Sequence, residues 1–216
     1  GLSGSARSVF ISTLYKETGR PMLVVAHNLF QAQKIYDDLV SLLGSDDVFL
    51  YSVNEVIAAE MAVASPELKA QRLEIMNHWA QEGKGVVVCP VAGLRRLLPP
   101  LSLWKHYLFT FSVGQELDLE RYKQLFVEMG YKRVATVSAP GEFSIRGGIV
   151  DIYPLTAELP YRIELFDTEI ESIRTFTPDD QRSHEQVDRV MIGPADEIIL
   201  NEEARQRGIE RIEAGL

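Results

Sequence analysis

The chain has 216 residues, 46% of them hydrophobic, which suggests one large domain or two small ones with a core of ordinary size. No apolar run approaches the roughly 18 residues that span a bilayer, so we expect no membrane partner. The formal net charge is −9, and residues 109–194 carry nine basic against fifteen acidic side chains, which disfavours nucleic-acid binding by this chain alone because phosphate contacts need a basic excess.

The first half of the chain alternates strands and helices. Continuous apolar runs predict buried parallel strands, and apolar residues at helical spacing between them predict amphipathic helices. The expected elements are strand 21–26, helix 29–43, strand 48–51, a helix from Pro66 with Ser65 as its N-cap, strand 86–89 and helix 91–98. This order predicts a doubly wound α/β layer over residues 1–108.

After Pro99-Pro100 the pattern changes mainly to strands. The expected elements are strand 107–113, helix 119–129, and strands 131–137, 148–153, 161–166, 170–176 and 187–192. Short turns between the later strands favour antiparallel pairing, and therefore an α+β domain over residues 109–194. Residues 195–216 include an expected helix over 201–214, and this segment is expected to return toward the first layer.

Cysteine and histidine usage gives no sign of a metal site. The one cysteine, Cys89, excludes an internal disulfide and fits a reducing, cytoplasmic environment. The chain opens with Gly and Ser rather than with a secretory signal. The histidines lack zinc-ligand spacing, and we expect no metal, no cofactor and no catalytic residue in this chain.

The first eight residues lie over the phosphate-loop pattern G-x-x-x-x-G-K-[ST], with two departures. Gly1 and Ser8 fit, but Ala6 stands where the second Gly belongs and Arg7 where the Lys belongs. That Gly lets backbone N–H groups wrap around the phosphates, and a forked Arg replaces a compact ammonium poorly. No strand ends in the Asp-Glu pair that would hold magnesium. We therefore interpret Gly1, Gly4, Ala6, Arg7 and Ser8 as a degenerate, inactive phosphate loop.

A longer motif follows in the second half. It reads Gly-Glu-Phe-Ser-Ile-Arg-Gly-Gly-Ile-Val-Asp-Ile-Tyr-Pro over residues 141–154, then Tyr-Arg-Ile-Glu-Leu-Phe over 161–166 and Glu-Ile at 169–170. Together with the degenerate loop, this resembles the N-terminal region of the bacterial transcription-repair coupling factors over essentially the whole chain. UvrB has a related version, but UvrB would keep the phosphate-loop Lys and a long DNA-gripping hairpin, for which the space between residues 51 and 65 is too short.

The resemblance implies a RecA-like parallel sheet domain with a degenerate phosphate loop, followed by an α+β domain similar to domain 2 of UvrB. It implies a non-catalytic module that binds UvrA and so brings nucleotide excision repair to stalled RNA polymerase. In the whole family protein, an ATP-dependent translocase acts on DNA and RNA polymerase, and a C-terminal domain masks the UvrA-binding face. Those contacts are expected for other parts of such a protein.

The resemblance also places the UvrA-binding surface on the second domain. Strand alternation independently puts Arg162, Glu164 and Phe166 on one face, opposite an apolar face at residues 163 and 165. An ordinary solvated face remains the alternative, with an Arg-Glu ion pair contributing about 0–1 kcal/mol. The residues expected to touch the partner are Arg146, Arg162, Glu164, Phe166 and Phe143.

Two other functions stay open at this point. One is a vestigial nucleotide-binding site that uses Arg7 in place of the Lys. The other is weak DNA binding by the UvrB-like layer. A nucleotide titration and a salt-dependent DNA-binding assay separate these functions from UvrA binding.

Overall fold

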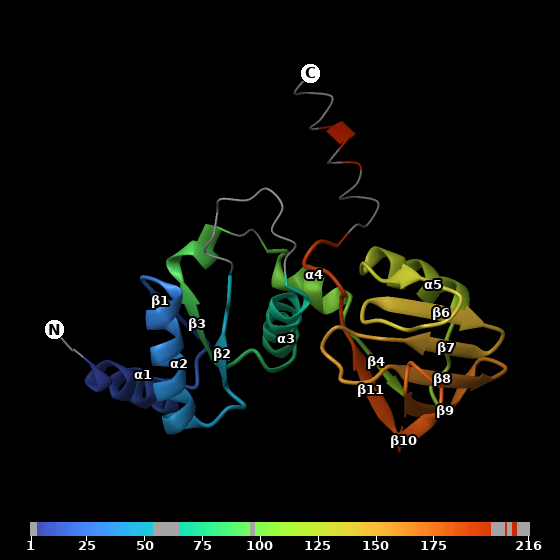
Figure 1. Ribbon diagram of the computed structural model, residues 1–216, viewed down its shortest axis with the longest axis horizontal. Helices are drawn as coiled ribbons and strands as arrows, with labels where there is room; N and C mark the ends of the chain where they lie inside the picture. Colours follow the sequence, from blue (N-terminus) through green and yellow to red (C-terminus); the bar gives the residue numbers. More distant parts are fainter. Residues whose placement is uncertain (1–3, 54–64, 96–97, 200–205, 207–208, 211–216) are drawn as a thin grey trace. The chain divides into compact units, whose positions relative to one another are not determined.

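The computed structural model describes residues 4–53, 65–95, 98–199, 206 and 209–210 (Figure 1). The chain divides into two compact units, Gly1–Leu101 and Ser102–Leu216, here called unit 1 and unit 2. Within the described residues, no helix combines the length and the apolar character that crossing a bilayer requires. The helix expected over residues 201–214 lies almost entirely outside the described residues.

Unit 1 is a small parallel sheet with helices on both faces (Figure 1). Its elements are α1 (Ser5–Thr18), β1 (Met22–Ala26), α2 (Leu29–Leu43), β2 (Val48–Leu50), α3 (Pro66–Glu82), β3 (Val86–Pro90) and the 3-10 helix η1 (Val91–Arg95). The strand order is β1-β3-β2, and both neighbouring pairs are parallel. The small parallel α/β sheet expected from the sequence is therefore confirmed.

The central strand β3 is buried on both faces, which explains its unbroken apolar sequence. Val86 and Val88 pack in the cluster that α1 and α2 form on one side of the sheet. Val87 and Cys89 pack on the other side, where α3 contributes Ile75. A strand between two helical layers has no solvated side, so every position along it is apolar.

Local capping fixes the ends of the helices in unit 1. The side chain of Asn28 accepts a hydrogen bond from the N–H of Gln31 at 2.9 Å, which starts α2, and the helix ends at Gly44. Ser65 precedes α3 as expected, but its hydroxyl bonds to the carboxylate of Glu67 instead of accepting from a backbone N–H. Ser65 therefore occupies the expected N-cap position, but its side chain makes no capping bond to the backbone.

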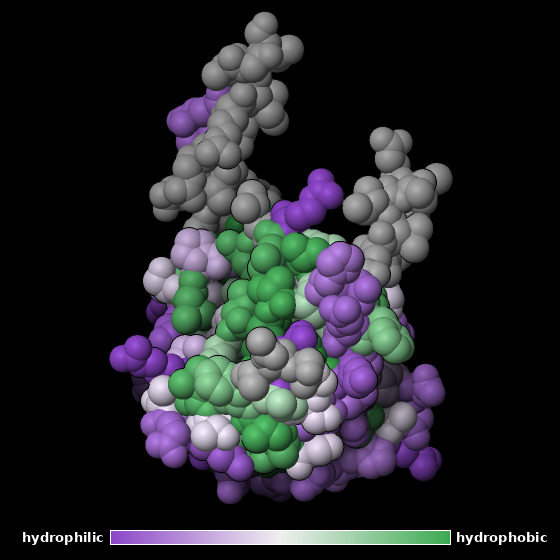
Figure 2. Space-filling view, turned by 90° about the vertical axis from the view of Figure 1, so that its left-hand side faces the viewer, coloured by the Kyte–Doolittle hydropathy of each residue, from purple (hydrophilic) through white to green (hydrophobic). Residues whose placement is uncertain are grey.

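Strand β1 lies at the edge of the sheet, and one of its faces is uncovered. Leu23 and Val25 are in register with Val87 and Cys89 and so point to the α3 side, yet they are 51% and 45% exposed. Exposed apolar side chains on α1 are Val9, Phe10 and Leu14. Figure 2 shows a broad apolar area on one side of the molecule. Unit 1 therefore exposes more apolar surface than scattered single residues would.

Unit 2 is built mainly from antiparallel strands (Figure 1). Its elements are α4 (Leu101–His106), β4 (Phe109–Ser112), α5 (Leu119–Glu128), β5 (Lys132–Arg133), β6 (Glu142–Arg146), β7 (Ile149–Ile152), β8 (Tyr161–Phe166), β9 (Glu169–Phe176), β10 (Ser183–Val187) and β11 (Arg189–Ile192). Six strands lie in the order β10-β9-β8-β7-β6-β5, and β11 pairs with β4. Only the β5–β6 pair in the described sheets of unit 2 is parallel. The expected antiparallel sheet is confirmed.

Four elements of unit 2 differ from the sequence expectation. The strands β6 and β10 and the helix α4 were not expected, and β5 is two residues long instead of the expected seven. Strand β10 lies at the sheet edge with four of its five residues exposed, so it has no buried face to produce an alternating pattern.

An aromatic cluster forms the core of unit 2. The ring of Phe126 on α5 lies 6.3 Å from Phe111, 6.0 Å from Tyr131 and 5.4 Å from Phe143, measured between centroids. Phe143 is completely buried, which corrects the expectation that it extends a partner surface. Its burial follows from strand alternation, because Phe143 and Arg146 point to opposite faces of β6.

The chain after β11 stays with unit 2 as far as it is described. The N–H of Ala195 donates to the carbonyl of Met129 at 2.8 Å, and the Tyr131 hydroxyl donates to the carbonyl of Gly193 at 2.8 Å. Burial raises the pKa of Tyr131. The start of the segment expected to return toward the first layer therefore packs beside α5, and residues 200–205 lie outside the described residues.

Candidate functional site

The described residues of the expected phosphate loop form the start of α1. Gly1 lies outside the described residues. Gly4 precedes the helix with a φ of 57°, and Ala6 and Arg7 lie in the first helical turn. Arg7 is exposed. Among the described residues, this region therefore presents a helix start with a cation beside it.

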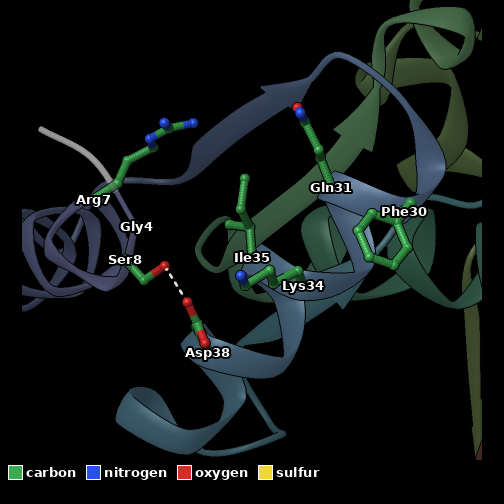
Figure 3. Close-up of a pocket in the computed structure, with 8 residues that line it drawn as sticks. All are labelled: Gly4, Arg7, Ser8, Phe30, Gln31, Lys34, Ile35 and Asp38. Carbon is green, nitrogen blue, oxygen red and sulfur yellow. Dashed lines mark hydrogen bonds between the residues drawn. The ribbon is translucent and has the colours of Figure 1, made fainter.

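Ser8, the last residue of the expected loop, is bonded to the neighbouring helix. It is 2% exposed, and its hydroxyl donates to the carboxylate of Asp38 on α2 at 2.8 Å (Figure 3). The same contact lies at a pocket of about 260 Å³ lined by Gly4, Arg7, Ser8, Phe30, Gln31, Lys34, Ile35 and Asp38. A carboxylate beside the loop serine repels phosphate, so this pocket is poorly suited to the chemistry of the original motif.

The sheet of unit 2 offers a different kind of site on the face opposite the aromatic core. Charged and hydroxyl side chains from four consecutive strands lie in register on this face, which we call the polar face. It comprises Ser144 and Arg146 on β6, Asp151 on β7, Arg162 and Glu164 on β8, and Ser172 and Arg174 on β9. The sequence places Arg162 and Glu164 on this face correctly.

A buried carboxylate lies at the centre of the polar face. Asp151 is 1% exposed, and its Oδ1 accepts from Nε of Arg162 at 2.7 Å. Its Oδ2 accepts at 2.9 Å from Nη2 of Arg162 and at 2.9 Å from Nη2 of Arg146. The hydrogen bonds that Arg162 donates to Asp151 raise the pKa of the Arg162 guanidinium. Charge-assisted bonds of this kind are among the strongest in proteins, so the three side chains hold one another in place.

Arg162 is held on two further sides. Its Nη2 also donates to Oε1 of Gln181 at 3.0 Å, and its guanidinium carbon lies 4.6 Å from the centroid of the Phe176 ring. The Arg162 side chain is consequently only 16% exposed. The carboxylate that holds Arg162 comes from β7, so the alternative of an ordinary surface pair between Arg162 and a Glu does not describe this side chain.

Glu164 belongs to a second cluster next to the first. Its Oε2 accepts from Nη2 of Arg174 at 2.7 Å and from the Ser172 hydroxyl at 2.8 Å, both across to β9. The Nε of Arg174 is buried and has no acceptor among the described residues. Asp151 and Arg162 face each other directly across β7 and β8, whereas Arg174 lies opposite Arg162 and bonds diagonally to Glu164.

Two hairpin turns place Arg146 and Phe166 at the same end of the sheet. The β6–β7 turn uses Gly147 at a φ of 58°, and a Cβ at Gly148 would lie 2.9 Å from the carbonyl oxygen of Leu165. The N–H of Leu165 donates to the carbonyl of Gly148 at 2.8 Å, which ties this turn to the end of β8. The two glycines are therefore required, one for the turn and one for the close approach.

The residues at this end of the sheet are the most accessible of the predicted site. Phe166 is 76% exposed, and the Arg146 side chain is 50% exposed. The β8–β9 turn after Phe166 uses Asp167 at a φ of 56°, a conformation that Asp tolerates better than most residues. Aromatic residues and arginines that are accessible on a rigid support are the kinds of residue enriched at protein-binding hot spots.

Sequence reasoning missed Asp151 and Gln181, the two residues that hold Arg162. An acidic residue between Val150 and Ile152 in a strand was the available signal for Asp151, because a buried charge there needs a partner. Nothing in the sequence pointed to Gln181, which reaches Arg162 from the β9–β10 turn. Among the described residues, no group of three or more His, Cys, Asp or Glu side chains could hold a metal ion.

Comparison with known proteins finds a family match within unit 2 and relatives over the whole chain. Residues 109–198, which contain the polar face, match the model of the family described as the UvrB interaction domain. The chain is 55% identical over all 216 of its residues to the transcription-repair-coupling factor of Bacillus subtilis (strain 168), of which it covers 18%.

Two further relatives are also transcription-repair-coupling factors. The identity is 40% over 203 residues for Staphylococcus aureus (strain USA300), covering 94% of this chain and 17% of the relative. It is 40% over 206 residues for Staphylococcus epidermidis (strain ATCC 12228), covering 95% and 18%. The chain thus spans under a fifth of the length of these curated relatives. The resemblance drawn from the sequence is confirmed: residues 109–198 match the UvrB interaction domain, and the chain is similar throughout to transcription-repair-coupling factors.

Proposed function

We propose that this chain is a non-catalytic recruitment module that binds UvrA through the polar face of unit 2. The match of residues 109–198 to the UvrB interaction domain supports a docking role for this unit. The name shared by the relatives connects transcription with DNA repair, so the bound UvrA would be brought to a repair complex associated with transcription. The activities of the longer relatives on DNA and RNA polymerase would belong to their other parts.

The observation that carries this proposal is the exposure of Phe166 and Arg146 at the same end of the sheet. Phe166 is 76% exposed, so its ring is not there to fill the core of unit 2. Burial of such a ring at an interface contributes a large share of the binding free energy, and a neighbouring Arg adds orientation. The surrounding sheet supplies a rigid support for both side chains.

The first test is a calorimetric titration of the chain with purified UvrA, using wild type and Phe166→Ala. We expect the substitution to weaken the affinity by about 2 kcal/mol, roughly thirtyfold, while the free energy of unfolding stays within about 0.5 kcal/mol. Phe30→Ala is the matched control, because Phe30 is 80% exposed on unit 1. Equal affinities of the two variants for UvrA would contradict the proposed surface, and no binding by folded wild type would contradict the recruitment function.

Arg162 is a poor choice for a first charge-reversal test. A Glu at this position would place a second carboxylate beside Asp151, which is 1% exposed, and the unit would lose stability whatever its partner. Arg146→Ala is the better variant, since Arg146 is half exposed and Arg162 remains to compensate Asp151.

We further propose that unit 1 is a RecA-like layer whose phosphate loop has lost nucleotide binding. The support is the Ser8–Asp38 hydrogen bond, which puts a carboxylate beside the last serine of the expected loop. Added ATP with magnesium should leave the thermal midpoint of unfolding unchanged, because a ligand that does not bind cannot stabilise the native state. An upward shift would favour the vestigial nucleotide site, and salt-dependent retention of DNA would favour the DNA-binding alternative.

A further inference from the structure

Asp151 uses both of its carboxylate oxygens inside the sheet. Each oxygen accepts at least one hydrogen bond from a guanidinium, at distances of 2.7 to 2.9 Å. The carboxylate is 1% exposed, against 16% for the side chain of Arg162 and 50% for that of Arg146. A partner that reaches this part of the polar face therefore meets the two guanidinium groups and not the acid between them.

Gln181 holds Arg162 from the turn between β9 and β10. Its Oε1 accepts from Nη2 of Arg162 at 3.0 Å, and its Nε2 donates to the carbonyls of Val137 at 3.2 Å and Pro178 at 2.8 Å. All the polar atoms of the Gln181 side chain are thus engaged. They connect Arg162 to the loop between β5 and β6 and to the β9–β10 turn.

The backbone of Gln181 is itself unusual. It adopts a φ of 60°, in the left-handed region that disfavours residues with a Cβ. Glycine would fit this turn without strain, yet the position holds a long polar side chain that bonds to Arg162. Backbone strain of this kind persists only where surrounding contacts hold it, and it gathers at functional sites.

The charge balance indicates what the partner group is. One carboxylate between two guanidinium groups leaves one net positive charge at this part of the polar face. Arg146 donates through Nη2 and Arg162 through Nε and Nη2, so the Nη1 of each has no acceptor among the described residues. Guanidinium N–H groups in fixed orientation suit a carboxylate, which accepts two such bonds at once.

We propose that Asp151 and Gln181 are positioning residues, which fix the guanidinium groups of Arg146 and Arg162 so that they receive a carboxylate of UvrA. This inference rests on the proposed function. Neither positioning residue needs to touch the partner. Their effect is to order two long side chains before binding, which lowers the entropic cost of docking.

The test is a double-mutant cycle between Gln181→Gly and Arg162→Ala, with affinity for purified UvrA measured by calorimetry. Glycine accepts the φ of Gln181, so the turn is kept while the support of Arg162 is removed. We expect Gln181→Gly to weaken binding about tenfold in the wild-type background and less than about twofold in the Arg162→Ala background. Circular dichroism checks folding, and Arg162→Lys replaces Arg162→Ala in the cycle if the latter unfolds.

Asp151→Asn gives an independent test, because a purely electrostatic role and a positioning role predict opposite changes in the affinity for UvrA. The substitution makes the surface more positive, so if charge alone set the affinity, binding to a carboxylate would strengthen. Positioning predicts a loss of about tenfold in the folded variant, since the amide has one acceptor oxygen where the carboxylate had two.

Three outcomes would overturn the inference. They are a folded Gln181→Gly variant that binds UvrA like wild type, equal losses in both backgrounds of the cycle, and tighter binding by Asp151→Asn. Each leaves the proposed function standing, because wild type still binds UvrA in all of them. Failure of folded wild type to bind UvrA would instead remove the proposed function together with this inference.

Discussion

Unit 1 and unit 2 both place basic side chains near carboxylates, but they hold them in different ways. Arg7 and Lys34 lie on two helices and are exposed, and the carboxylate between those helices, Asp38, is bonded to Ser8. In unit 2, Arg162 is bonded to Asp151 on the neighbouring strand, and Asp151 is 1% exposed.

The difference lies in how each side chain is ordered. A long side chain on an exposed helix surface keeps its rotamer freedom and must lose it when a ligand binds. Strand register instead brings Arg146 and Arg162 to one acceptor, and hydrogen bonds order them before any partner arrives. The fixed orientation of its arginine side chains therefore distinguishes the candidate site in unit 2 from the charged surface of unit 1, since charged residues are present in both.

The largest expected effect comes from removing the apolar support beneath the polar face. Phe143→Ala should lower the free energy of unfolding by about 4 kcal/mol, because a completely buried aromatic ring leaves a cavity. Urea denaturation followed by circular dichroism measures it. Val127→Ala is the control, since Val127 is 49% exposed on α5. A loss below about 1 kcal/mol would mean that the core under the polar face can close around the cavity.

A smaller effect tests the comparison between the two arginines directly. Arg162→Ala should cost about 3 kcal/mol of stability, because it leaves the buried Asp151 with Arg146 as its one remaining cation. Arg7→Ala should change the free energy of unfolding by no more than about 0.5 kcal/mol. Parallel urea titrations of both variants provide the measurement. Similar costs at the two positions would show that the arginine of unit 1 is held as firmly as that of unit 2.

The smallest effect concerns the turn that leads into β6. The Glu142 carboxylate accepts from the N–H of Ser138 at 2.9 Å and of Ala139 at 3.0 Å. Desolvation opposes ionisation, but these hydrogen bonds outweigh it and hold the pKa of Glu142 below its ordinary value of 4.5. We expect Glu142→Gln to cost about 1 kcal/mol near pH 7.

The pH dependence of that cost has a definite sign. A carboxyl whose pKa is lowered by folding stabilises the native state above its unfolded pKa, and this contribution is lost as the pH falls through the lower folded pKa. The difference in stability between wild type and Glu142→Gln should therefore narrow as the pH falls below about 4. Urea titrations at several pH values measure it, and a difference that stays constant down to about pH 3 would argue against the assigned hydrogen bonds.

Local sequence signals predicted most of the regular structure correctly. The helix 29–43 is α2 without change, because apolar spacing and caps at Asn28 and Gly44 are all local. The strand 161–166 is β8 for the same kind of reason. The polar edge strand β10 escaped prediction, since an exposed strand carries no alternating pattern.

The candidate site was predictable only in part. Strand alternation placed Arg162, Glu164 and Phe166 on one face, and the family resemblance added Arg146. Phe143 was assigned to the surface because it is close to Arg146 in sequence, although three residues along a strand reverse the face. The acceptors of the charged groups could not be assigned, because they lie on other strands and in a distant turn.

The sequence by itself determined the parallel and antiparallel layers of this protein, its similarity to the coupling factors and the face on which the charged residues lie. Only the tertiary structure decided that Asp151 is buried between two arginines and that Gln181 reaches Arg162 from the β9–β10 turn. The physical reason is that periodicity and capping act over a few neighbouring residues, whereas strand register joins residues that are far apart in the chain.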